Sequence, residues 1–345
     1  SPVALTLQFI GVPGDYRAAV SHRTILDLQL FGGRIYIAHG DSIANTGPVL
    51  PAFFDLAANA LGRDPGFQFD EEAIEKFRVD GQTLVAPGRD GREGWELGSF
   101  YRLRGGTWTK LRTVPGAVHV WDVASRPGVL VASGSTETTA GRLWESRDEG
   151  RTWRQALEYH RGSENGVSYD ASSVVVTLNG SFYAITSRDG CYRGDGANWI
   201  RVDCFGGGNI MLSKSDSDGN TVVGVPYYTA YFGTKMMNLY FLDSQRSWVV
   251  TFDDLVVDAI SREGRWVVLT SRSDGGGELY MASSLRCRCR DDFKLAATIE
   301  APPAGEANPR GNGPTALEYA EGRFYVGFAD GRLFRSAPVS GLFSD

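Results

Sequence analysis

Hydrophobic and polar residues alternate along the whole chain in short runs, each bounded by glycine, asparagine or aspartate. This period of two residues predicts β-strands. Helical three-to-four spacing is hard to find outside residues 69–77. The clearest runs are rich in β-branched and aromatic residues, and seven of them follow one another at similar intervals. They are RIYIAHG from Arg34, TLVAPG from Thr83, VLVASG from Val129, SFYAITS from Ser181, TVVGVP from Thr221, RWVVLTS from Arg265 and RFYVGFA from Arg323.

Large aromatic residues recur in step with these runs. Trp108, Trp153, Trp199, Trp248 and Phe293 are separated by 45 to 49 residues. A repeat of this length, with four strands per unit, is typical of a β-propeller blade. Two stacked β-sandwiches are the alternative, but no Pro/Ser-rich linker interrupts the repeat.

The repeats predict an all-β fold, a single seven-bladed propeller over residues 1–345. The seventh unit is one strand short, and we expect residues 3–10, VALTLQFI, to complete it and close the ring. The predicted blades are 24–69, 74–114, 117–160, 167–205, 208–252, 254–300, and 314–338 with 3–10. The 43 Gly, 14 Tyr, 18 Phe and 8 Trp agree with a strand-rich chain.

One unit ends in SRDEGRTW, from Ser146 to Trp153, and weaker copies end at Trp108, Trp199 and Trp248. This motif resembles the Asp box, or BNR repeat, of propellers that include sialidases, glycan lyases and non-catalytic binding proteins. The resemblance implies a turn between the third and fourth strands. Asp148 would accept backbone N–H groups, Gly150 would adopt a positive φ and Trp153 would pack inward. We therefore assign the motif no catalytic role. The FRIP motif typical of sialidases is absent, which disfavours that activity.

The loop face of a propeller carries the starts of the first strands and the ends of the second strands, and ligands usually bind there. Three of the 4 histidines map to this face. Histidine and tyrosine are suited to proton transfer. The predicted catalytic residues are His22, His39, His119 and Tyr228; the alternative is that the histidines bond to the backbone of their own strands.

Similar seven-bladed polysaccharide lyases place two histidines as His22 and His39 are placed here, with tyrosine and arginines around them. Such chemistry needs a base, a cation for the uronate carboxylate and a proton donor. A glycoside hydrolase would instead need two carboxyl groups, for which Asp41, Asp90, Glu96 and Asp170 are candidates. The predicted substrate-binding residues are Arg23, Asp41, Asn45, Arg89, Asp90, Trp95, Glu96, Tyr169, Arg188, Tyr227, Tyr231 and Arg272.

The net charge and the composition limit the classes of binding partner that we expect. The 35 basic and 41 acidic residues give a net charge of −6, which argues against nucleic-acid or anionic-membrane binding. We expect a monomer that binds a polysaccharide or oligosaccharide and needs no cofactor. The segments GDGANW and DSDGN contain spaced acidic residues compatible with a structural calcium ion, but neither completes an EF-hand pattern. The first residues lack the basic start and apolar centre of a signal peptide.

The cysteines bear on the compartment. Cys191 and Cys204 flank two adjacent predicted strands, so antiparallel pairing would bring them together as a disulfide. Such a bridge indicates a secreted or periplasmic protein; free thiols in a cytosolic protein are the alternative. Cys287 and Cys289 would form either a strained C-x-C bridge or an exposed thiol pair.

Together, the repeats, the loop-face residues and the cysteines predict a lyase or hydrolase acting on an acidic, uronate-containing glycan. The alternative is a non-catalytic propeller that binds glycan or protein.

Overall fold

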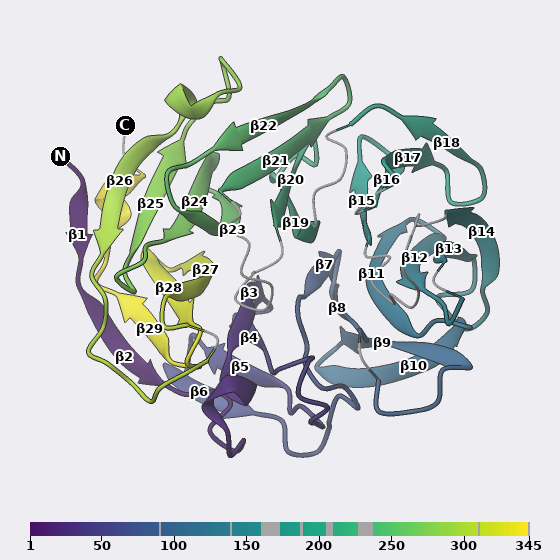
Figure 1. Cartoon of the computed structure of the whole chain (residues 1–345), viewed down its shortest axis with the longest axis horizontal. Helices are drawn as coiled ribbons and strands as arrows, with labels where there is room; N and C mark the ends of the chain where they lie inside the picture. Colours follow the sequence, from purple (N-terminus) through teal and green to yellow (C-terminus); the bar gives the residue numbers. More distant parts are fainter. Residues whose placement is uncertain are drawn as a thin grey trace.

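The computed structural model describes residues 1–89, 91–138, 140–159, 173–186, 189–204, 210–226, 237–309 and 311–343. These residues form seven sheets arranged in a ring, each built on four antiparallel strands (Figure 1). The strands follow chain order from the centre outward, except that the N-terminal segment supplies the outer strand of blade seven and a fifth strand of blade six. The predicted seven-bladed propeller is therefore confirmed. Only short 3-10 helices occur in the described part of the chain, η1 (Val20–Arg23), η3 (Arg290–Asp292) and η4 (Ser340–Leu342). None has the length and apolar character needed to span a membrane.

The strands of each blade are numbered from the centre of the ring outward. The innermost strands are β3 (Ile25–Phe31), β7 (Arg78–Asp80), β11 (His119–Arg126), β15 (Ser173–Leu178), β19 (Ile210–Ser215), β23 (Leu255–Arg262) and β27 (Pro314–Ala320). The second strands are β4 (Arg34–His39), β8 (Thr83–Pro87), β12 (Val129–Ser135), β16 (Ser181–Thr186), β20 (Thr221–Pro226), β24 (Arg265–Ser271) and β28 (Arg323–Phe328).

Third and outer strands complete the blades. The third strands are β5 (Ala52–Asp55), β9 (Leu97–Arg104), β13 (Gly141–Ser146), β17 (Cys191–Gly194), β21 (Asn238–Asp243), β25 (Gly277–Ala282) and β29 (Leu333–Ser336). The outer strands are β6 (Ala60–Arg63), β10 (Thr107–Pro115), β14 (Arg154–Tyr159), β18 (Trp199–Val202), β22 (Ser247–Thr251), β26 (Lys294–Ile299) and β2 (Leu7–Gly11).

The N-terminal segment closes the ring. Strand β2 pairs antiparallel with β29 and supplies the missing outer strand of blade seven, as predicted. Strand β1 (Val3–Leu5) departs from the prediction in detail, because it pairs in parallel with β26 and adds a fifth strand to blade six. The same segment therefore bonds to two neighbouring blades.

The hydrophobic core lies between neighbouring blades. The periodic aromatic residues each pack there: the Trp108 ring lies 6.1 Å from Tyr36 of blade one, and the Trp153 ring 5.9 Å from Phe100 of blade two. Each blade thus covers its apolar face on the next, which is why the sequence repeats blade by blade.

The turn at residues 146–153 has the expected hydrogen bonds. The Asp148 carboxylate accepts the backbone N–H of Thr152 at 2.9 Å and its hydroxyl at 2.6 Å, and these bonds lower the pKa of Asp148 to about 2. Gly150 has a φ of 83°. The turn joins β13 to β14 and serves the fold.

Buried carboxylates join the inner strands of neighbouring blades. Three aspartates occupy β-bulges of inner strands and have no exposed surface. Each accepts a backbone N–H from the next blade or from the segment that leads into it. The pairs are Asp27 with Phe77 at 3.0 Å, Asp122 with Val175 at 3.0 Å and Asp258 with Leu317 at 2.7 Å.

Basic side chains offset this buried negative charge. Lys214 of blade five lies 2.9 Å from Asp27 and 3.1 Å from Asp258, so it links blades five, six and one. Burial opposes its charge, but the two aspartates raise the pKa of Lys214 overall. Lys76 and Arg78 contact Asp122 at 3.4 and 2.5 Å. The ion pairs thereby fix the ring from its centre.

Candidate functional site

Two long loops and one crossing segment cover the loop face over blades one and two. The loops follow β4 and β8, and residues 64–77 cross from β6 to β7. The crossing segment pairs with both loops through the bridges Val49–Phe69, Gly40–Ala73 and Glu71–Gly91. It forms no helix, despite the helical spacing of residues 69–77, because its backbone bonds to the neighbouring loops instead.

His39 is sealed at the end of β4. Its ring is completely buried, and Nδ1 donates to the Ile37 carbonyl at 3.2 Å. Nε2 therefore accepts a hydrogen bond from the Tyr16 hydroxyl at 2.8 Å. The same hydroxyl accepts the Leu50 N–H at 2.9 Å. Burial lowers the pKa of His39 to about 4. This placement favours a structural role over the predicted role in proton transfer.

Arg23 holds the N-terminal loop in place. Its guanidinium donates to the carbonyls of Arg17 at 2.8 Å and Ala18 at 3.1 Å, and lies 3.7 Å from the Glu306 carboxylate. Arg23 therefore has partners within the protein, and its predicted contact with substrate stays a prediction. The neighbouring His22 is half-buried in η1.

Five side chains converge where blades one, two and three meet. We call Ser42, Glu75, Arg89, His119 and Trp121 the loop-face cluster. The guanidinium of Arg89 is ion-paired with Glu75 and lies 4.6 Å from the Trp121 ring centre. The Ser42 hydroxyl donates to the same Glu75 oxygen at 3.0 Å. The His119 ring stacks on Trp121 with 5.1 Å between ring centres and 10° between planes.

The electrostatics of the cluster keep His119 neutral. Burial, with a smaller contribution from the Arg89 charge, lowers the pKa of His119 to about 3. Blade two is tied to the start of β11 here, because the Val120 N–H donates to the Gly88 carbonyl at 3.1 Å. A neutral imidazole, a carboxylate and a guanidinium are thus held together by three different segments. Such a set can accept a proton, donate one and bind an anion.

The other predicted residues on this side are spread out. Asp41 is buried and accepts the Ile43 N–H at 3.0 Å, which shapes its loop. Asn45 is exposed with a φ of 48°. Trp95 is exposed, and Glu96 pairs with Arg112 at 2.5 Å.

Arg272 belongs to a different part of the ring. It follows β24 of blade six, pairs with Asp274 at 3.1 Å and bonds to carbonyls of its own blade. It is not part of the loop-face cluster. The remaining predicted site residues lie outside the described residues: Asp90, Tyr169, Asp170, Arg188, Tyr227, Tyr228 and Tyr231.

Four residues of the site were not predicted, namely Tyr16, Ser42, Glu75 and Trp121. The rule that residues just before an inner strand reach the loop face would have selected Glu75, which lies three residues before β7. The alternation of β11 would have placed Trp121 beside His119. No comparable signal marks Tyr16, which lies in irregular structure.

The acidic residues proposed for calcium cap turns. Asp195 accepts the N–H groups of Ala197 and Asn198, and Asp216 accepts those of Asn220 and Thr221. Among the residues that the structure describes, no group of three or more His, Cys, Asp or Glu side chains is arranged to hold a metal ion.

Two cavities lie apart from the cluster. One of about 510 Å³ lies between blades two and three on the opposite face, where Arg102, Arg104, Arg126 and Arg147 accompany an apolar floor. The other, of about 500 Å³, lies beside blade one between the N-terminal segment and Arg63.

The comparisons with known proteins establish the fold alone. No protein-family model matches the chain, and no curated protein matches it significantly. Virginiamycin B lyase from Staphylococcus aureus matches with a TM-score of 0.59 at 8% identity, over 96% of this chain and 99% of that one. The propeller domain of the Trilobed protease from Pyrococcus furiosus gives 0.54 at 13% identity, over 91% and 95%.

A glycoside hydrolase is also similar in structure. The GH74 enzyme from Niastella koreensis matches with a TM-score of 0.62 at 12% identity, over 90% of this chain and 52% of that one. The chain therefore corresponds to about half of that enzyme. At these identities the likeness shows a shared propeller architecture, which hosts many unrelated activities.

Proposed function

We propose that this protein is a carbohydrate-active propeller that binds an acidic, uronate-containing glycan at the loop-face cluster and cleaves it by lyase or hydrolase chemistry. The observation that carries the proposal is the convergence of Glu75, Arg89 and His119 from three segments of the chain. The presence of a lyase and a GH74 enzyme among the structural neighbours supports a catalytic propeller.

A lyase would use the cluster in the following way. Arg89 would bind the uronate carboxylate and offset the negative charge that develops when the α-proton leaves. His119, which stacks on Trp121 next to Arg89, would accept that proton. We propose Tyr228, outside the described residues, as donor to the leaving oxygen. In this scheme Glu75 and Ser42 orient Arg89.

A hydrolase would need a second carboxyl group about 5 to 10 Å from Glu75. Asp41 and Asp90 are the candidates, since both belong to the loops that border the cluster. Water would then be added across the glycosidic bond, whereas a lyase adds none.

Binding without cleavage is the second candidate function. It is favoured by the extent to which the candidate catalytic and binding side chains already bond to the protein, as Arg23 and His39 do. We also propose that the protein is exported to an oxidising compartment, secreted or periplasmic, on the basis of its two disulfides.

Mass spectrometry of the products tests the proposal. The protein is incubated with a panel of uronate-containing polysaccharides, and Arg89→Gln and Glu75→Gln are compared with Arg142→Gln. Arg142 is an arginine of β13 in blade three that pairs with Glu158 of β14 at 2.6 Å and is not one of the five cluster residues. If the summed mass of the products equals that of the substrate, the protein is a lyase. If it exceeds that of the substrate by one water for each bond broken, the protein is a hydrolase. Binding without products supports the second candidate, and absence of both binding and products overturns the proposal.

A further inference from the structure

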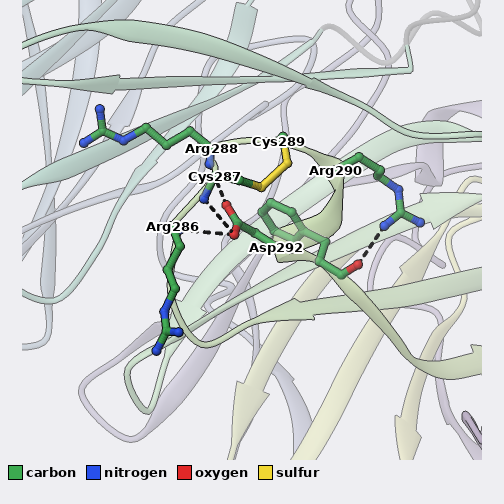
Figure 2. The surroundings of a disulfide bond; sticks show 7 residues. Arg286, Cys287, Arg288, Cys289, Arg290 and Asp292 are labelled. Carbon is green, nitrogen blue, oxygen red and sulfur yellow. Dashed lines mark hydrogen bonds between the residues drawn. A yellow bond between two sulfur atoms is a disulfide. The ribbon is translucent and has the colours of Figure 1, made fainter.

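The segment between β25 and β26 contains a disulfide with a single residue inside it. Cys287 and Cys289 are bonded to each other, with Arg288 between them and Arg286 and Arg290 on either side (Figure 2). Cys287 is exposed, so one sulfur belongs to a residue that solvent can reach. The loop-face cluster makes no use of this element.

A carboxylate holds this loop independently of the sulfur atoms. Asp292 accepts the backbone N–H groups of Arg286 and Cys287 at 3.1 Å each and that of Arg288 at 2.7 Å. Figure 2 shows the Asp292 carboxylate directed at these three N–H groups. Opening of the disulfide would leave the bonds of Asp292 to Arg286 and Cys287 in place and keep the two thiols close together.

The closed loop also fixes Arg288 in an unusual conformation. Its φ is 56°, in the left-handed region that residues other than glycine rarely adopt. Its side chain pairs with Asp243 at 3.0 Å and lies 4.8 Å from the centre of the Trp248 ring, both on blade five. Release of the disulfide would allow Arg288 to leave this conformation, which favours the open form.

The second disulfide of the chain differs in each of these respects. Cys191 and Cys204 are 13 residues apart, and Cys191 is completely buried at the start of β17. It packs in the core between blades four and five. Its partner Cys204 is half-buried. A bridge with one cysteine in the core is less open to thiol attack, whereas exposed or strained bridges are the labile ones.

We propose that Cys287 and Cys289 form a redox-active pair that exchanges with small thiols, while the Cys191–Cys204 disulfide remains structural. A thiolate attacks Sγ of Cys287, forms a mixed disulfide and releases the Cys289 thiolate, which takes up a proton. A second thiol then attacks the mixed disulfide. Two small thiols are oxidised to one small disulfide, and the protein disulfide is reduced to two thiols.

Differential alkylation with glutathione as the probe tests this inference. The folded protein is equilibrated at a series of ratios of reduced to oxidised glutathione, quenched with acid, alkylated and mapped by peptide mass spectrometry. We expect half of the Cys287–Cys289 disulfide to be reduced at a ratio of reduced to oxidised glutathione at least about tenfold lower than the ratio that reduces half of the Cys191–Cys204 disulfide. Opening of both disulfides at the same ratio would overturn the proposal, as would free thiols at 287 and 289 that remain unpaired in oxidised glutathione.

Two neighbouring acidic residues provide a matched pair of variants. Asp292→Ala removes the carboxylate that holds the loop, so the thiols lie together less often and the disulfide should open at a ratio roughly tenfold less reducing. Asp291→Ala removes one negative charge from an exposed position of the same turn and should change nothing. Equal shifts in both variants would indicate a general charge effect and contradict the proposed role of the loop.

Discussion

His39 and His119 lie at the loop-face ends of β4 and β11; His39 is completely buried and His119 is half-buried. Burial depresses both pKa values, but the surroundings of the two rings differ. His39 is bonded to Tyr16 and the backbone, whereas His119 stacks on Trp121, next to the ion pair between Arg89 and Glu75. Sequence position predicts the same catalytic role for both histidines, but their contacts in the structure differ.

This difference predicts opposite results for two substitutions, if the protein cleaves a glycan. His119→Gln should lower kcat by roughly two to four orders of magnitude, as expected for loss of a general base. His39→Gln should change kcat by less than about tenfold and act mainly on stability. Steady-state kinetics on the substrate found by the product assay measures both. A larger loss for His39→Gln than for His119→Gln would return the catalytic role to His39.

His39 also predicts a pH dependence of stability. The unfolded ring binds a proton near pH 6.5, but the folded one binds it only near pH 4. Between these values the unfolded state carries more protons, so the free energy of unfolding falls as the pH falls. The total loss is about 3 kcal/mol. Urea unfolding of the wild type and His39→Gln at pH 7, 5.5 and 4.5 measures the free energy of unfolding at each pH. We expect this free energy to depend less on pH in the variant; the same dependence in both proteins would contradict the prediction.

Sequence rules recover part of the loop-face cluster. His119 and Arg89 follow from the polarity of propeller strands, and Glu75 obeys the same rule. The contact between Tyr16 and His39 could not be predicted, because it joins residues 23 positions apart through an irregular segment whose path depends on the bonds of Arg23. The burial of a histidine side chain could not be predicted from the sequence either, because a buried histidine and an accessible one can occupy equivalent strand positions.

At the scale of elements, the inner strands depend on carboxylates placed at bulges. Asp122 accepts a backbone N–H from blade four and contacts Lys76 and Arg78 of the blade-two segment. Removal of its charge leaves both cations without this partner in the interior. Lys76 can lose its proton, since burial lowers its pKa to about 8, but a guanidinium stays charged.

Asp122→Ala should therefore lower the free energy of unfolding by about 3 to 5 kcal/mol. Glu158→Ala, which removes the partner of Arg142 on the exposed edge of the same blade, should cost less than about 1 kcal/mol. Guanidinium chloride unfolding followed by circular dichroism measures both variants. Similar losses in the two would show that the buried network contributes no more than a surface ion pair.

The strands themselves were predictable because every blade repeats the same burial pattern. Residues 69–77 were not, since their three-to-four spacing arises from contacts with two different loops. The spacing of buried residues matches a helix, but the backbone hydrogen bonds go to strands and loops outside the segment.

At the scale of the whole molecule, the ring is closed by one short segment that bonds to blades six and seven. Deletion of residues 1–11 removes β1 and β2 and exposes the edges of β26 and β29. Exposed sheet edges pair with other chains, so we expect this variant to aggregate. Deletion of residues 1–5 removes only β1 and should remain soluble. Light scattering tests both, and a monomeric 12–345 variant with an unchanged Tm would show that closure does not depend on this segment.

We propose that the glycan binds at the loop-face cluster. A crystal structure of the protein soaked with an acidic uronate oligosaccharide tests it most directly. We expect density for the sugar over blades one to three, with its carboxylate within hydrogen-bond distance of Arg89 and its ring beside His119. Density confined to the cavity on the opposite face, between blades two and three, would contradict the claim, as would a crystal that binds none of the oligosaccharides.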